Sequence, residues 1–341
     1  MRGEKFKAQV RRREKVMSNK LVWPAPTSDV LDRGEESAFQ KGSAYVDGKI
    51  IPIEEAKVPL LDWGFLRSDA CQDTVSVWDG SFFRLTDHLD RFERSVQRLR
   101  MDTAPVTRSD IHRIVHKLVA VCGFRDAYVQ IIMTRGRPPI GSRDLRLCSN
   151  SFQAFCVPYM WIANPEKQEI GMAVHVSRRV RIPPQSVDPL VKHYHWLDFE
   201  MGLFEAYENG ADTVVLTDLD GNITEGPGFN VFAVIDGVLR TPSFGMLDGM
   251  TRRTVMELCN ELNLDVTQET ISLERLLIAS EIFLTTTAGG IIPVSSVNGT
   301  GIGFGSVGEQ TRRIHRSYWD KRSSGWYGEP VAYAQKALLE P

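Results

Sequence analysis

Residues 74–99 read TVSVWDGSFFRLTDHLDRFERSVQRL, and the hydrophobic pattern of this stretch changes halfway along. In the first half, two apolar segments flank Asp79-Gly80, a dipeptide typical of tight hairpin turns. In the second half, apolar residues recur at the spacing of one helix face: Leu89, Phe92, Val96 and Leu99. Thr86 or Asp87 is the expected helix cap. The stretch therefore predicts a β-hairpin followed by an amphipathic helix.

The same two kinds of element surround this unit. Upstream, Asp47-Gly48 is flanked by apolar segments and predicts a hairpin over residues 43–53. Downstream, a second helical pattern spans residues 109–123, and strand-like segments follow at 127–133 and 151–159. This half of the chain mixes hairpins with paired helices.

The second half continues this mixture. Strands are expected at 171–180, 213–216, 222–224, 229–235, 238–240 and 281–286. Helices are expected at 198–209, 251–262, 272–278 and 307–320. Because turn signals separate the strands between 213 and 240, we expect them to form an antiparallel sheet. The chain lacks a regular strand-helix-strand alternation, so the fold class is predicted to be α+β.

The length of 341 residues suits about two domains. We expect an N-terminal extension or arm at 1–42, a small α+β domain at 43–160, a linker at 161–165 and a large α/β domain at 166–341. Residues 1–16 are strongly basic and precede Met17 directly, so they are either an upstream extension or a flexible basic tail.

Composition narrows the class of function. With 41 basic and 43 acidic residues, the formal net charge is -2, so no overall field favours nucleic acid or an anionic membrane. No apolar stretch is long enough to span a bilayer, and no signal peptide is recognisable. The five cysteines are scattered and form no C-x-x-C pair, which favours a reducing cytoplasm. A small-molecule substrate is expected.

Two patterns that resemble functional motifs are interpreted as structural. Residues 301–308 are rich in glycine but lack the context of a nucleotide-binding loop, so a loop before the last helix is expected. His112 and His116 have helical i, i+4 spacing, but no third ligand is recognisable in the sequence. No metal is therefore expected.

Several further segments contain candidate functional residues, and they are informative only when taken together. Lys192 lies among aromatic and apolar residues, where loss of water would lower its pKa and make it nucleophilic, although an exposed lysine is the default interpretation. The remaining segments are His88-Leu89-Asp90-Arg91, Thr224-Glu225-Gly226-Pro227-Gly228-Phe229-Asn230, Leu247-Asp248-Gly249-Met250-Thr251-Arg252 and Thr285-Thr286-Thr287-Ala288-Gly289-Gly290. A helix start together with threonine hydroxyls is suited to bind a phosphate.

In this order, these segments resemble the motifs of the fold-type IV pyridoxal-phosphate (PLP) enzymes, which include branched-chain aminotransferases, D-amino-acid transaminases and aminodeoxychorismate lyases. The resemblance covers about residues 43–319. Within the family, 62–65, 68–69, 75–80 and 134–136 resemble the (R)-selective amine transaminases. The resemblance implies a two-domain fold like that of D-amino-acid aminotransferase, with PLP at the domain interface, and a homodimer.

The resemblance also implies roles for individual residues. Lys192 would bond the cofactor covalently and then move the substrate proton. Glu225 would pair with the pyridine nitrogen, and Arg91 would bind the phosphate. The remaining implied cofactor contacts are backbone N–H groups of Met250 and Thr251, hydroxyls of Thr286 and Thr287, and ring contacts of Gly228 and Phe229. Trp196 would lie near the substrate.

The substrate pocket departs from the relatives. Residues 67–72 read RSDACQ, where amine transaminases usually have H-S-D-x-x-Y, so Arg67 and Gln72 become candidate substrate-binding residues. The carboxylate-binding Arg-x-His of D-amino-acid transaminases is missing, but Arg143 lies in the corresponding loop. The implied reaction is ping-pong amino transfer from an amine or amino acid of R or D configuration to a keto acid such as pyruvate.

Alternatives stay open at this point. A lyase of the aminodeoxychorismate type, a branched-chain or D-amino-acid transaminase, and a non-catalytic protein with the same fold all fit the resemblance. Intact Lys192 and Glu225 argue against the last of these.

Overall fold

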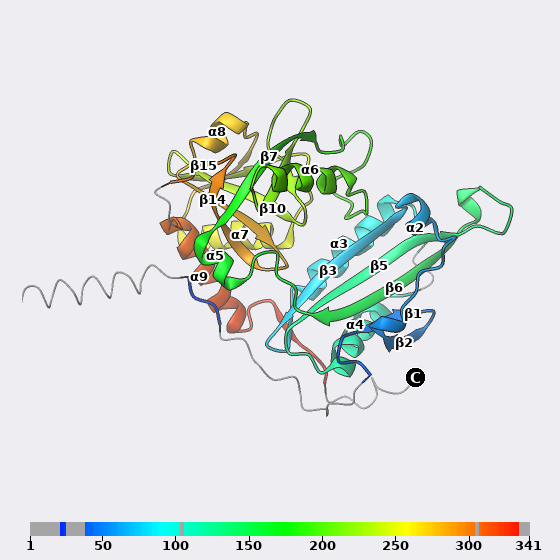
Figure 1. Ribbon diagram of the computed structural model, residues 1–341. Coiled ribbons are helices and arrows are strands. Elements are labelled where there is room, and N and C mark those ends of the chain that lie inside the picture. The colour runs from blue at the N-terminus through cyan, green and yellow to red at the C-terminus, as the bar shows by residue number, and fades with distance from the viewer. Residues whose placement is uncertain (1–20, 25–37, 103–105, 304–306, 334–341) are drawn as a thin grey trace, which may run out of the picture.

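Two β-sheets lie side by side, each covered by helices, in a computed structural model that describes residues 21–24, 38–102, 106–303 and 307–333 (Figure 1). The combination of helices with one antiparallel and one mixed sheet confirms the predicted α+β class. Most of the predicted arm at 1–42 and part of the glycine-rich loop at 301–308 lie outside the described residues.

The first sheet has seven strands and is antiparallel throughout. In spatial order the strands are β16 (Gly328–Pro330), β4 (Ser81–Phe83), β3 (Ala70–Trp78), β5 (Ala127–Arg137), β6 (Ser149–Pro158), β1 (Ser43–Val46) and β2 (Lys49–Pro52). Both predicted hairpins are confirmed, with Asp47 and Asp79 in the left-handed region of their turns. Strand β16 lies close to the C-terminal end of the described chain. The first sheet is therefore complete only when these late residues pair with β4.

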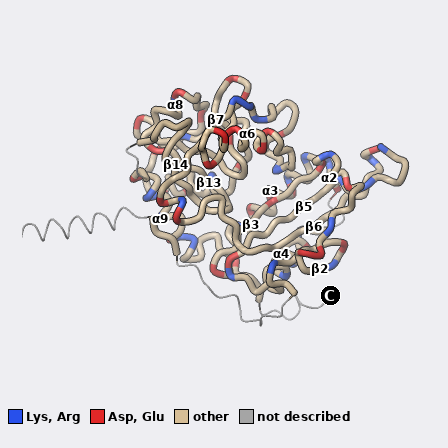
Figure 2. The backbone as a smooth tube through the Cα atoms, in the orientation of Figure 1, with Lys and Arg blue, Asp and Glu red and all other residues tan. Residues whose placement is uncertain are grey.

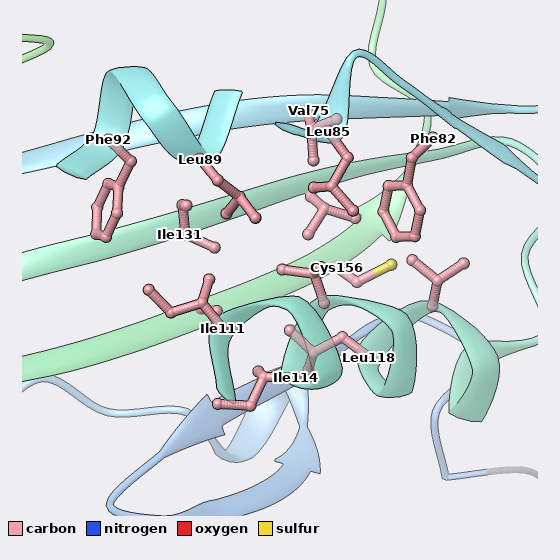
Figure 3. Packing of buried hydrophobic residues seen from close by; sticks show 14 of the residues in the cluster. Val75, Phe82, Leu85, Leu89, Phe92, Ile111, Ile114, Leu118, Ile131 and Cys156 are labelled. Atoms are coloured by element: carbon pink, nitrogen blue, oxygen red, sulfur yellow. The ribbon is translucent and has the colours of Figure 1, made fainter. Parts of the chain in front are cut away.

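Helices α3 (Leu85–Arg98) and α4 (Arg108–Cys122) bury their apolar faces against this sheet in one cluster (Figure 3). Helix α4 begins with a capping box between Thr107 and Asp110. Helix α3 begins at Leu85, one or two residues before the predicted cap, because Arg84 adopts a left-handed conformation that ends the hairpin and starts the helix directly. The short helices η1 (Ile53–Glu55), α2 (Trp63–Arg67) and η2 (Leu145–Leu147) lie in the connections.

The second sheet has nine strands and is mixed. The strands of its main path are β12 (Val266–Glu269), β11 (Val238–Pro242), β10 (Phe229–Ile235), β13 (Glu281–Thr286), β14 (Gly290–Val297), β7 (Met172–Val180) and β8 (Thr213–Thr217). Two short strands, β9 (Glu225–Gly226) and β15 (Thr300–Gly301), pair with β10 and β14.

The expectation of a wholly antiparallel run between residues 213 and 240 is wrong. Strand β8 pairs in parallel with β7, because α6 (Leu197–Glu208) carries the chain across the sheet between them. Residues 222–224 form single bridges at Asn222 and Ile223 and are not a strand. Only β9, β10 and β11 of this run form antiparallel hairpin pairs.

The remaining helices surround the second sheet: α5 (Pro165–Ile170), α7 (Met250–Leu262), α8 (Leu273–Leu277) and α9 (Glu309–Ser323). The predicted linker at 161–165 runs into α5, since Pro165 is the first residue of that helix and the side chain of Asn164 caps it. Acidic and basic residues are interspersed around both sheets (Figure 2). Among the described residues, no helix has both the length and the apolarity needed to cross a bilayer.

Candidate active site

A cavity of about 290 Å³ is lined by residues from both sheets. The first sheet contributes side chains from β3 and β5, and α3 contributes Arg91. The second sheet contributes the turn from β9 to β10, the start of α7 and the end of β13. Segments that are far apart in the sequence therefore line the same cavity.

Lys192 lies in the segment between β7 and α6, which crosses back to the first sheet. Its carbonyl accepts a hydrogen bond from the Gln72 N–H at 2.9 Å, and its own N–H donates to Ser95 Oγ at 3.3 Å. Burial and, to a smaller extent, the nearby Arg91 cation lower the pKa of the Lys192 ammonium, Asp73 and Glu225 oppose this, and the net pKa is about 8. About a tenth of the Lys192 side chains are therefore neutral, nucleophilic amines at pH 7, and about half are neutral at pH 8.

Arg91 lines the same cavity, and a buried carboxylate holds it from behind. Asp73 accepts hydrogen bonds from Arg91 Nε and Nη2, both at 2.8 Å, and Arg91 Nη1 donates to the Asp248 carbonyl at 2.9 Å. His88 Nδ1 lies 2.7 Å from the same carboxylate. Burial alone would raise the pKa of Asp73, but Arg91 and His88 hold it well below the usual value. Two guanidinium N–H bonds, one on Nη1 and one on Nη2, remain available for a ligand.

Glu225 is buried at the start of β9, with its carboxylate held on both oxygens. Oε1 accepts from Arg181 Nε at 3.2 Å, and Oε2 accepts from the Leu247 N–H at 2.9 Å. Burial raises the pKa of Glu225, and the Arg181 cation counteracts that rise. The structure thus presents an anchored carboxylate at the cavity wall.

The start of α7 and the end of β13 supply hydrogen-bond donors to the cavity. Met250 and Thr251 are the first residues of α7, so their N–H groups have no partner within the helix. The buried Thr285 hydroxyl finds no hydrogen-bond partner among the described residues, and Thr286 Oγ1 accepts from the Ala288 N–H at 3.1 Å. Thr287 lies beside them at the cavity wall. Together with the Arg91 cation, this arrangement suits an anion such as a phosphate.

The turn that carries Gly228 and Phe229 forms another wall of the cavity. Gly228 has φ of +83°, and a Cβ there would lie 3.5 Å from Ile162 and 3.8 Å from Trp196. The ring of Trp196 packs edge-on against Phe199, with centroids 5.6 Å apart. Gly228, Phe229, Ile162, Trp196 and Phe199 all line the cavity.

Gln72 and its neighbours form a polar wall on the β3 side. Gln72 Oε1 accepts from the Thr74 hydroxyl at 3.0 Å, and Tyr128 OH lies 3.4 Å from the same hydroxyl oxygen. Since Thr74 has one proton to donate, Tyr128 is the donor of the second bond. This chain of bonds fixes the amide, and its Nε2 is left as a donor.

The two predicted arginines of the substrate pocket lie elsewhere. Arg67 does not line the cavity, and its guanidinium stacks on Trp63 at 3.5 Å from the ring centroid. Arg143 is exposed in the connection between β5 and β6, which projects from the end of the first sheet (Figure 1). The other predicted site residues all line the cavity: Gln72, Arg91, Lys192, Trp196, Glu225, Gly228, Phe229, Met250, Thr251, Thr286 and Thr287.

Sequence analysis missed two charged residues here, Asp73 and Arg181. A signal existed for Asp73, because a carboxylate in an apolar strand must find a partner when it is buried. No comparable signal marked Arg181, which is one of three arginines near the end of β7.

Away from the cavity, His112 and His116 meet a third protonatable side chain, Glu329 of β16. Its Oε1 lies 3.0 Å from His116 Nε2 and within hydrogen-bond distance of His112 Nε2. The Ala332 N–H donates to His116 Nδ1, so the neutral ring carries its proton on the nitrogen that faces Glu329. These contacts tie β16 to α4.

Comparisons with known proteins identify the family of this chain. A family model described as amino-transferase class IV matches residues 70–297. A Methanocaldococcus jannaschii protein, provisionally named a branched-chain-amino-acid aminotransferase, is 34% identical over 285 residues, covering 82% of this chain and 96% of that protein. The branched-chain-amino-acid aminotransferase of Pseudomonas aeruginosa is 26% identical over 310 residues, covering 89% and 98%.

Solved structures show the same likeness. The crystal structure of the Escherichia coli branched-chain amino acid aminotransferase has a TM-score of 0.78 at 26% identity, covering 82% of this chain and 94% of that one. The Thermoproteus uzoniensis branched-chain aminotransferase with norvaline has a TM-score of 0.77 at 26% identity, covering 85% and 99%. Because the family model spans well over half of the sequence, the chain belongs to the class IV aminotransferases, which are PLP-dependent transaminases of fold type IV.

Proposed function

We propose that the cavity holds PLP with Lys192 as its covalent attachment and Arg91 as its main phosphate contact. The buried Thr285 hydroxyl without a partner, the N–H groups at the start of α7 and the two available N–H bonds of Arg91 support this assignment. Thr286 and Thr287 add hydroxyls from the same wall. Gly228 and Phe229 border the space for the cofactor ring, and Glu225 faces its pyridine nitrogen.

Bound PLP supplies an electron sink for the electron pair left when a substrate Cα loses its proton. Lys192 would take up that proton from Cα and deliver it to C4' of the cofactor within the same half-reaction, and would move a proton in the opposite direction when the acceptor reacts. Its lowered pKa of about 8 is the observation that carries this role, because the amine must be neutral to accept a proton. The surrounding burial excludes water that would compete for the proton.

The proposed donors are amines or amino acids of R or D configuration, and the acceptor is a keto acid such as pyruvate. The motif resemblance over residues 62–80 supports the stereochemistry. The fixed Gln72 amide offers an N–H donor at the cavity wall, which favours carboxylates and keto groups over purely hydrocarbon substituents. Trp196 supplies an apolar surface next to it.

Branched-chain L-amino acids are the second candidate donors. The observation that favours them is the naming of the relatives, since those from M. jannaschii, P. aeruginosa and E. coli all carry the name of branched-chain aminotransferases. The cavity has apolar wall residues such as Ile162 and Met160 that suit such side chains.

A homodimer in the cytoplasm is also proposed. Four apolar side chains of one segment are more than half exposed: Leu60, Leu61, Phe65 and Leu66. Such a cluster is typical of a surface that a second protein covers, and a second copy is the partner proposed here. All five cysteines are free thiols, which suits a reducing compartment.

Two measurements test these proposals. Borohydride reduction of the PLP-loaded protein, followed by peptide mass spectrometry, should place the cofactor adduct on Lys192, and an adduct on another lysine would contradict the assignment. Enantiomer pairs of alanine and 1-phenylethylamine, with L-leucine and L-valine, should then be assayed with pyruvate and 2-oxoglutarate. Faster turnover of D-alanine than of L-leucine supports the first donor class, and the reverse supports the second. Release of many equivalents of pyruvate per enzyme from a donor without any acceptor would indicate a lyase, because the half-reaction of a transaminase releases at most one equivalent.

A further inference from the structure

Arg181 lies directly behind the carboxylate that faces the cofactor ring in the proposed function. It follows β7, and its N–H donates to the Thr217 carbonyl at 2.8 Å, which fixes its backbone to β8. The buried guanidinium donates to Glu225 Oε1 at 3.2 Å through Nε and to Asp198 Oδ2 at 2.7 Å through Nη1. Its central carbon also lies 4.2 Å from the ring centroid of Phe199. The cation is thus held on three sides.

Asp198 is itself anchored. Its Oδ2 also accepts from the Ile182 N–H at 3.0 Å, and its Oδ1 accepts from the Phe199 N–H at 2.9 Å. Among the described residues, Arg181 is the only cation within ion-pair distance of Glu225. Arg181 therefore favours the charged form of Glu225 more than the Leu247 N–H or the more distant Lys192 does.

A buried carboxylate without a countercharge tends to take up a proton, because burial penalises its charged form. A carboxylate facing a pyridine nitrogen has two ways to share one proton. The proton can stay on the oxygen, which leaves both groups neutral, or it can lie on the nitrogen, which leaves an ion pair. Only the second arrangement gives the ring its full capacity as an electron sink.

We propose that Arg181 is a positioning residue that keeps Glu225 ionised, so that the shared proton lies on the pyridine nitrogen. The inference rests on the proposed role of Glu225. Arg181 touches the carboxylate directly and therefore stabilises its charge more than it opposes a charge on the nitrogen beyond it. Asp198 balances the remaining charge of the guanidinium and holds it in place.

The test loads each protein with PLP labelled with ¹⁵N at the ring nitrogen and measures the ¹⁵N chemical shift. The wild type and Arg181→Lys, which keeps the charge, should both show a protonated nitrogen. Arg181→Met should shift the signal to that of the unprotonated nitrogen. Arg181→Gln is a second neutral variant in case the first fails to fold. For both neutral variants, kcat should fall about 10- to 100-fold, as for other supporting contacts, with a smaller change in KM.

Two further variants serve as matched controls. Arg322 is an equally buried arginine outside the cavity that bonds to Ser76 and Tyr318, so Arg322→Met should lower stability without moving the ¹⁵N signal. Asp198→Asn keeps the positive charge of Arg181 beside Glu225, so the ring nitrogen of PLP bound to this variant should stay protonated.

The outcomes separate this inference from the proposed function. A protonated nitrogen in the neutral Arg181 variants would overturn the role of Arg181 and leave that of Glu225 intact. An unprotonated nitrogen in the wild type would overturn the role of Glu225, and the inference would fall with it. A cofactor adduct away from Lys192 would overturn the proposed function before either question arises.

Discussion

Asp73 holds Arg91 with both carboxylate oxygens, each at 2.8 Å from a different guanidinium nitrogen, in a site from which both side chains are almost fully excluded from solvent. This pairing directs the remaining N–H bonds of the guanidinium toward the cavity. Arg91 thus contributes both to the stability of the fold, through its pairing with Asp73, and to the proposed binding of phosphate. The two contributions can be separated by mutation.

Arg91→Ala should weaken PLP binding by about a hundredfold or more, because two charge-assisted hydrogen bonds of roughly 1.5–3 kcal/mol each are lost. It should also lower the free energy of unfolding by about 3–5 kcal/mol, since the buried Asp73 loses its guanidinium partner and keeps only His88 and the Thr74 N–H. Adding Asp73→Asn should restore much of the stability and none of the cofactor affinity. Urea unfolding of the apoprotein and a PLP titration measure the two effects, and recovery of affinity in the double variant would contradict this division.

The capture of PLP by the apoprotein should accelerate as the pH rises through about 8. The neutral amine of Lys192 is the nucleophile, and burial lowers its pKa from 10.5 to about 8, so the neutral fraction rises across this range. Stopped-flow absorbance at a series of pH values gives the apparent pKa. Lys192→Ala is the control that should show no such phase, whereas a midpoint near that of a solvated lysine would show that the amine is exposed.

Gln72→Tyr should raise kcat/KM for (R)-1-phenylethylamine relative to D-alanine, because an aromatic wall replaces an amide whose unmatched burial costs roughly 1–3 kcal/mol. Thr74→Val should act in the same direction more weakly, since it removes the 3.0 Å bond that fixes the amide. Arg67→Ala is a useful comparison, because its guanidinium stacks on Trp63 away from this cavity. An equal ratio of the two donors in the wild type and both cavity variants would show that this wall does not select the donor.

Phe65→Asp should weaken the proposed dimer by at least about 30-fold, the effect of removing an interface contact worth 2 kcal/mol or more. Sedimentation equilibrium measures the dissociation constant. Leu219→Asp is the matched control, because Leu219 is similarly exposed but lies in a turn of the second sheet. If both variants associate as the wild type does, the segment around Leu60 to Leu66 is not the contact surface.

Elements bounded by clear turn signals could be predicted from the sequence to the residue. Both β10 and β13 begin and end where they were expected, because each apolar run stops at a polar or glycine-rich turn. Strand β14 was not predicted, since its segment contains Pro293, which cannot donate to a ladder and argues against a strand. Pro293 is nevertheless opposite Phe283 in the register, where the surrounding strands determine its conformation.

Part of the candidate site could likewise be predicted from the sequence, and part could not. Lys192, Glu225 and the start of α7 belong to local motifs, and a local motif can be recognised in one sequence. The contact between Arg181 and Glu225 joins residues 44 positions apart, and the contact between Asp73 and Arg91 depends on how α3 packs on β3. Such pairs arise from tertiary packing, so neither spacing nor composition indicates them.

The late position of β16 affects the synthesis of the chain. Strand β4 is made early, but among the described residues its outer edge pairs with Gly328–Pro330 alone, and Glu329 contacts His116 across 213 positions of sequence. At ribosomal rates of about 5–20 residues per second, that edge waits unpaired for roughly 10 to 50 s. An uncovered strand edge can pair with other chains. A ribosome that stalls before residue 328 would therefore hold a nascent chain prone to aggregate, until the last strand arrives with Pro330 to block further pairing.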